Sequence, residues 1–188
     1  MCFRKLWVLS LVLPGVASMA ICQEPADVRE VKYGKVVLSI PKTWEEQKLS
    51  NNFRLAQFAI PAAEGEKPAE LTIFNFGGGS GLAANVDRWK KQFAAEGRQF
   101  KARAGKSPSG HYVYVDLSGT YNKPVGPPIR RRTVPTQNSR MLGVMFGSER
   151  QASFFIKLVG PAKTVAAQVD AFRASFGPDE KSEKPFEG

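Results

Sequence analysis

The sequence predicts an α+β fold, in which a mostly antiparallel six-stranded sheet packs against two amphipathic helices in the order βββ-α-βββ-α. Six short runs are rich in β-branched and aromatic residues and are bounded by proline, glycine or charged turns. Two further segments space their large apolar residues at intervals of four, three and four, which is typical of one helix face. Short connections between the strands favour antiparallel pairing, because parallel strands need long crossovers.

The first three strands are expected at residues 35–41, 53–61 and 70–76. The runs KVVLSIP and FRLAQFAIP each end at a proline, which cannot continue a hydrogen-bonded ladder. In ELTIFNF, Leu71 and Ile73 fall on one face of a strand while their neighbours fall on the other.

The first helix is expected after the glycines of the stretch FNFGGGSGLAANVDRW. Leu82, Val86, Trp89 and Phe93 form one apolar stripe, and Gly97 provides a stop signal. We expect this stripe to press against the sheet, so that Trp89 is a core residue in preference to part of an exposed binding platform.

The second half of the chain repeats the order of the first. HYVYVDLSGTY, at residues 111–121, alternates strongly, and two nearly continuous apolar strands follow at residues 139–148 and 151–160. A hairpin fits between these last two strands. The final helix is expected to begin at Pro161 and to end before Pro178. Its apolar stripe is Val165, Val169, Phe172 and Phe176.

The chain is expected to contain one domain, which is large enough to bury a core of its own. The only cysteines, Cys2 and Cys22, precede that domain, so neither a disulfide framework nor a thiol nucleophile is expected in it. The expected segments are a signal peptide at 1–22, a lead-in at 23–34, a single α+β domain at 35–177 and a mobile charged tail at 178–188.

A signal peptide is indicated by Arg4 and Lys5 before an uncharged apolar run, which is too short to span a membrane comfortably. We therefore expect an exported protein, periplasmic or extracellular. Cleavage after Ala20 is favoured, and cleavage after Cys22 is the alternative. A lipid anchor on Cys22 is a third interpretation. It is disfavoured because a lipidation site has a small residue before the cysteine, and Ile21 is not small.

The formal charge of the chain is +10, and removal of residues 1–22 leaves +8. A basic exported domain favours acidic proteins or anionic envelope polymers as partners, although the charge alone is also explained by solubility. Nucleic acid is disfavoured as a partner, because the chain is exported and carries no recognised nucleic-acid-binding motif.

Several motifs resemble a family of secreted bacterial proteins of unknown function. These are P-x-x-W in SIPKTW, N-V-x-R-W-x-x-Q-F from Asn85 to Phe93, and F-F-x-K-x-x-G-P in SFFIKLVGP, within a match that covers most of residues 35–176. The order of elements is more distantly similar to the PsbP-like superfamily, which includes extrinsic photosystem subunits and assembly factors. This resemblance implies a non-enzymatic module and transfers no catalytic residue.

The glycine loop is a candidate anion site formed by Gly78, Gly79, Ser80 and Arg88. It lacks the lysine of a phosphate-binding P-loop, and its glycine spacing differs from the dinucleotide fingerprint. Free amides at the start of the helix could nevertheless hold an anion. We favour the simpler interpretation, in which the glycines turn the chain and Ser80 caps the helix.

A second candidate site is the basic cluster of Arg130, Arg131 and Arg132, in a loop rich in proline and glycine. The cluster either contacts an acidic partner or is simply solvated. No other pattern indicates chemistry. His111 has no neighbouring ligand for a metal, and Lys157 is read as an edge residue with a wet amine. We expect no catalytic residue, metal or cofactor.

These observations favour an exported, non-enzymatic binding or accessory module that contacts an acidic partner or polymer. The alternative is a receptor or enzyme for a small anionic ligand that uses residues 77–80 at the helix N-terminus. A purely structural envelope protein is a third possibility.

Overall fold

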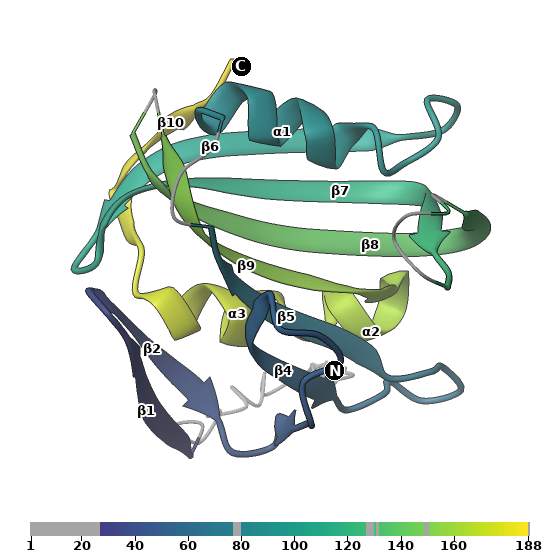
Figure 1. The fold of residues 1–188 in the computed structure, drawn as a ribbon, viewed down its shortest axis with the longest axis horizontal. Coiled ribbons are helices and arrows are strands. Elements are labelled where there is room, and N and C mark those ends of the chain that lie inside the picture. The colour runs from purple at the N-terminus through teal and green to yellow at the C-terminus, as the bar shows by residue number, and fades with distance from the viewer. Residues whose placement is uncertain (1–26, 77–79, 127–129, 131, 149–150, 188) are drawn as a thin grey trace, which may run out of the picture.

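An eight-stranded antiparallel sheet forms the middle layer of the molecule (Figure 1). The computed structural model describes residues 27–76, 80–126, 130, 132–148 and 151–187. Across the sheet the strands are β10 (Asp179–Pro185), β6 (Gln99–Ser107), β7 (Gly110–Pro124), β8 (Thr133–Gly147), β9 (Ala152–Pro161), β5 (Ala69–Asn75), β4 (Arg54–Ile60) and β3 (Glu45–Glu46). A separate hairpin pairs β1 (Val28–Tyr33) with β2 (Val36–Pro41).

Helices lie on both faces of this sheet. Helix α1 (Leu82–Lys90) covers one face, while α2 (Ala162–Ala166), α3 (Val169–Phe176) and the β1–β2 hairpin lie on the other (Figure 1). The α+β class and the antiparallel pairing are therefore confirmed. None of the helices among the described residues is long and apolar enough to cross a bilayer.

The prediction of six strands was wrong, because β1, β3, β6 and β10 were not expected. In β6 the positions that face the α1 layer are Phe100, Ala102 and Ala104. Two of these three residues are small, so apolar and polar residues alternate only weakly along the strand. Strand β10 has the sequence DEKSEKP and lies at a sheet edge, where charged residues are tolerated because one side of the strand faces water. The lead-in likewise contains β1, which is closed by Gly34 at φ +61°.

The charged tail that we expected to be mobile instead contains β10, fixed by a buried carboxylate. The side chain of Glu183 is 4% exposed and accepts a hydrogen bond from Tyr112 Oη at 2.7 Å. It also pairs with Arg103 Nε and Arg173 Nη2, each at 2.9 Å. One side chain thus joins the last strand to β6, β7 and α3.

The final helix is two helices. A break at Gln168 separates α2 from α3, and Trp44 Nε1 donates a hydrogen bond to the side-chain oxygen of Gln168 at 3.0 Å. The apolar stripe holds across the break, because Val165, Phe172 and Phe176 are all buried. Trp44 is 1% exposed, so it is a core residue.

Two apolar layers sandwich the sheet. On the α1 face, Leu82, Val86, Trp89 and Phe93 are buried as the spacing predicted. Trp89 lies directly on Gly143 of β8, where any added Cβ would overlap with the indole ring. A side chain larger than hydrogen at position 143 would therefore lift α1 off the sheet.

Candidate functional site

Strands β7 and β8 extend beyond β6 and β9 as a two-stranded ribbon, and its base is also hydrogen-bonded to residues 92–94 after α1. We use the term arm for residues 119–139, of which 127–129 and 131 lie outside the described part of the chain. Pairing of β8 with β9 begins only at Ser139, whereas β7 and β8 stay paired from Tyr121 to Pro124. A register shift between Gly119 and Tyr121 marks the base of the arm. Such bulges re-aim a ribbon relative to its parent sheet.

The arm is basic and contains no acid. Residues 117–148 include neither Asp nor Glu, and their basic residues are Lys123, Arg130, Arg131, Arg132 and Arg140. Of the predicted cluster, Arg130 and Arg132 are exposed, while Arg131 lies outside the described residues. Residues 133–138 of β8 are also exposed, and Val134 keeps half of its surface in contact with solvent.

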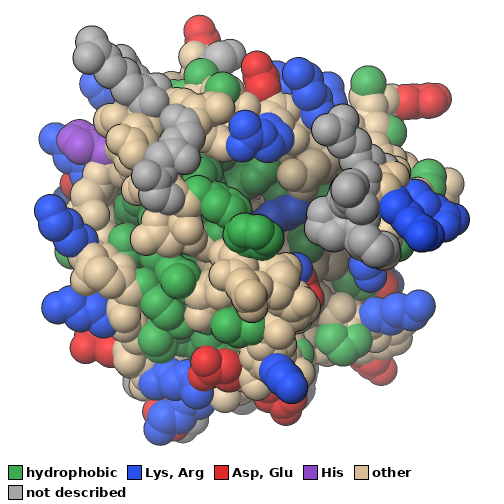
Figure 2. Space-filling view, viewed as in Figure 1, with side chains coloured by type: hydrophobic (Ala, Val, Ile, Leu, Met, Phe, Trp, Pro, Cys, Tyr) green, Lys and Arg blue, Asp and Glu red, His purple; other side chains and the backbone are tan. Residues whose placement is uncertain are grey.

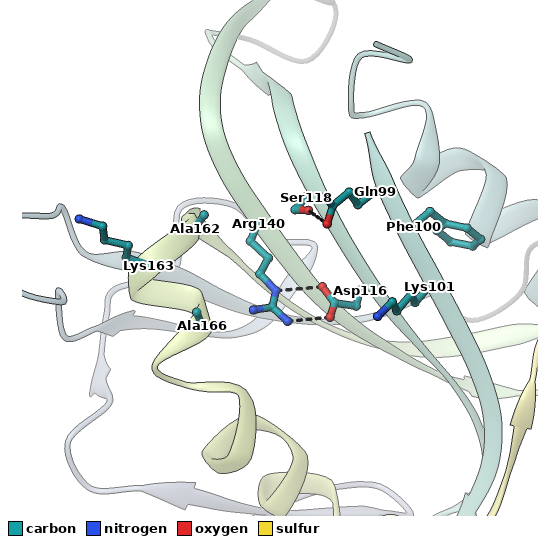
Figure 3. A pocket seen from close by; sticks show the side chains of 9 residues that line it. All are labelled: Gln99, Phe100, Lys101, Asp116, Ser118, Arg140, Ala162, Lys163 and Ala166. Carbon is teal, nitrogen blue, oxygen red and sulfur yellow. Dashed lines mark hydrogen bonds and ion pairs between the residues drawn. The ribbon is translucent and has the colours of Figure 1, made fainter. Parts of the chain in front are cut away.

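A groove lies at the base of the arm, which we call the α2 groove (Figure 3). Its volume is about 440 Å³. Side chains from β6, β7, β8 and α2 line it, among them Gln99, Lys101, Asp116, Ser118, Arg140 and Lys163. Because Ser118 and Arg140 are the register pair immediately before the arm, groove and arm form one continuous surface.

An ion pair forms the floor of the α2 groove. Arg140 donates from Nε to Asp116 Oδ1 at 2.9 Å and from Nη2 to Oδ2 at 2.7 Å. The hydrogen bond to Asp116 raises the pKa of Arg140. Figure 3 shows the Lys101 amine pointing toward Asp116 and the Lys163 side chain pointing outward. These cations exceed the single carboxylate in the groove, so its character is basic.

The predicted glycine-loop site is partly assembled. Gly78 and Gly79 lie outside the described residues, but Ser80 and Arg88 meet, with 3.4 Å between the Nη2 and Oγ atoms. Arg88 also donates to Asn85 Oδ1 at 2.8 Å. The Arg88 guanidinium is thus engaged by the loop's own side chains. The idea that Ser80 caps the helix was wrong, because Gly81 is the N-cap and no side chain caps it.

Asn85 is the residue of this loop that the sequence reasoning missed. It is buried, and its Nδ2 donates to the carbonyl oxygens of Ser80 at 2.7 Å and Gly81 at 2.9 Å. The sequence signal for its burial was its position next to Val86, which belongs to the apolar stripe. The contacts hold the end of the glycine loop against α1.

Lys157 does not lie at an edge, because β9 is flanked by β8 and β5. Its amine donates to Gln92 Oε1 and, at 3.1 Å, to Tyr121 Oη. Burial lowers the pKa of Lys157 to about 8. The Glu70 charge raises this pKa, and the Arg54 charge lowers it. No local sequence pattern indicates this network, since its members are far apart in the chain.

His111 is exposed and pairs across the β6–β7 hairpin with Lys106. Within the described part of the chain, no group of three His, Cys, Asp or Glu side chains is placed to hold a metal ion.

Comparisons with known proteins give structural likeness alone. No protein-family model matches the sequence, and no curated protein matches it. A crystal structure of a protein of unknown function from Pseudomonas aeruginosa has 16% identity and a TM-score of 0.42, over 78% of this chain and 91% of that one. The solution structure of the cyanobacterial PsbP protein (CyanoP) from Synechocystis has 13% identity and a TM-score of 0.43, over 90% of this chain and 99% of that one. Membership of the motif family described above stays a prediction.

Proposed function

We propose that the chain is an exported, non-enzymatic binding module that docks an acidic segment of a partner protein onto the arm and the α2 groove. The main support for this proposal is the arm, which contains no acidic residue and exposes Arg130 and Arg132 to solvent. A patch of one charge sign raises the rate of encounter with an oppositely charged partner and selects against like-charged ones.

The shape of the surface favours an extended partner. From Gly119 to Pro124 the arm spans about 17 Å at the usual rise of a strand. The α2 groove adds Lys101 at the base of the arm, and Lys123, Arg130 and Arg132 lie farther along it, so basic side chains stand at both ends. An extended acidic peptide can follow such a line, whereas a small anion would use only one end of it.

The competing anion site is less well supported. Arg88 is engaged by Asn85 and Ser80, so an anion at the glycine loop would have to displace contacts already made. The arm's own sequence contains no carboxylate that would compete with a partner for its arginines. This difference favours the arm as the binding surface.

The test uses a labelled oligoglutamate peptide and fluorescence anisotropy, first at low and then at physiological salt. Binding should weaken as salt rises, because exposed charges are screened over about 8 Å at physiological ionic strength. Changing Arg130, Arg131 and Arg132 together to serine should weaken binding about tenfold or more at low salt.

The matched control changes Lys32, Lys35 and Lys48 to serine, which removes the same net charge elsewhere. Oligoglutamate binding should be nearly unaffected in this control. If both triple variants lose affinity equally, the protein attracts anions only through its total charge and the arm is not the binding site. Unchanged binding in the arginine variant would lead to the same conclusion.

A further inference from the structure

A second cavity lies near the opposite end of β7 from the arm, and we call it the β10 cavity. Its volume is about 550 Å³, and it is open to solvent. The β6–β7 hairpin, the start of α1, the end of β8 and the last strand all contribute to its walls. Volumes in this range are usual for sites that bind small molecules.

Positive charge collects at the rim of this cavity. Lys106 and His111 are cross-strand partners, and Lys184 of β10 joins them in the lining. Figure 2 shows the single histidine with Lys or Arg side chains beside it. Among the described residues that line the cavity there is no carboxylate. The nearby Glu183 carboxylate is committed to Tyr112, Arg103 and Arg173.

The floor of the β10 cavity is apolar. Leu82 is a largely buried member of the core under α1, and the partly buried Ala104 and Phe186 pack against the same cluster. Phe186 is held there by its backbone N–H, which donates to the Ala102 carbonyl at 3.0 Å. An aliphatic chain on this floor would extend the core and release water from it.

We infer that the β10 cavity binds a single-chain amphiphile with an anionic head, such as a fatty acid. The head group pairs with the amines of Lys106 and Lys184, and the tail lies on Leu82, Ala104 and Phe186. Neither half of the site suffices alone, because exposed ion pairs are weak and an aliphatic chain makes no oriented contact that fixes its position. The inference is independent of the proposed function, since it uses other residues at another end of the sheet.

Binding of decanoate, measured by titration calorimetry below its micelle concentration, tests the site. Decanol keeps the tail without the charge, and butyrate keeps the charge with a short tail. Decanoate should bind with one-to-one stoichiometry and about tenfold more tightly than either comparator, since a charged hydrogen bond or a few buried methylenes contribute this much.

The decisive variant is Lys106→Gln with Lys184→Gln. Both side chains are exposed, so the fold should persist, which far-UV circular dichroism would check. The variant should weaken decanoate binding about tenfold and leave decanol binding unchanged. The control is Lys32→Gln with Lys35→Gln, which removes equal charge from β1 and the turn after it and should leave decanoate binding as in the wild type.

Four results would overturn the inference. They are an absence of decanoate binding, equal affinity for decanol, full decanoate binding by the Lys106 and Lys184 variant, and an equal loss in the control variant. Vesicles of phosphatidylglycerol distinguish a membrane lipid from a free amphiphile. Attachment to these vesicles, without any binding of monomeric decanoate, would show a charged membrane contact in place of a ligand site.

Discussion

At the scale of single residues, Lys157 is the side chain whose environment departs furthest from its sequence context. It stands among apolar residues in FFIKLV. Its amine, however, lies inside a network with Gln92 and Tyr121. Only the fold brings these residues together, so the pattern along β9 could not reveal it.

Lys157 should make stability depend on pH in the mildly alkaline range. Because burial lowers its pKa to about 8, the folded protein releases this proton at a lower pH than the unfolded chain does. The unfolded chain then binds more protons above pH 8, so the free energy of unfolding should increase by about 2 kcal/mol between about pH 8 and pH 9.5.

Urea unfolding at successive pH values measures this rise, and Lys157→Met should flatten it. The rise should be followed only up to about pH 9.5, because burial raises the pKa values of Tyr114 and Tyr121 to about 12. The tyrosines of the unfolded chain deprotonate near pH 10, which lowers the free energy of unfolding at higher pH. An equal slope in the wild type and the variant would show that the Lys157 amine is not the group responsible.

At the scale of elements, the apolar stripes were the most predictable features. Trp89, Phe93, Phe172 and Phe176 are buried as their spacing required. Strands β6 and β10 were missed because their inward positions carry small or charged residues, which do not alternate visibly with the outward ones. The arm was only partly predicted, since the proline-rich residues 122–138 suggested a loop, whereas Tyr121–Pro124 pairs with Thr133–Thr136.

The contact between α1 and β8 can be tested at Gly143. Gly143→Ala should reduce the free energy of unfolding by about 2 kcal/mol or more, because the new methyl group overlaps with the Trp89 ring. Combining it with Trp89→Leu should cost less than the two single changes added together, since the smaller side chain makes room. Thermal or urea unfolding of all four proteins provides the cycle. Strict additivity would mean that the two residues do not press on each other.

At the scale of the whole molecule, the sheet is completed by residues from the far end of the chain. Composition predicted a mobile tail because residues 178–188 are charged and lack a core pattern. The deciding feature is one carboxylate, Glu183, matched by groups from three other elements. Such long-range pairing leaves no local signature in a single sequence.

Ending the chain after Gly177 should therefore destabilise the entire domain. Glu183→Gln should reproduce much of the effect, about 3 kcal/mol, because it leaves two arginines and a tyrosine without their shared anion. Glu187→Gln is the control, since this exposed carboxylate lies two residues beyond the end of β10. If the truncated protein and both variants melt together with the wild type, β10 contributes nothing to stability.

The position of β10 also bears on how the protein matures. Its partner β6 lies more than seventy residues earlier, at the pairing of Asp179 with Lys106. During synthesis the β6 edge of the sheet therefore has no neighbouring strand until residues 179–185 have been made. Because contacts between residues far apart in sequence form slowly, the pairing of β6 with β10 should be among the last steps of folding.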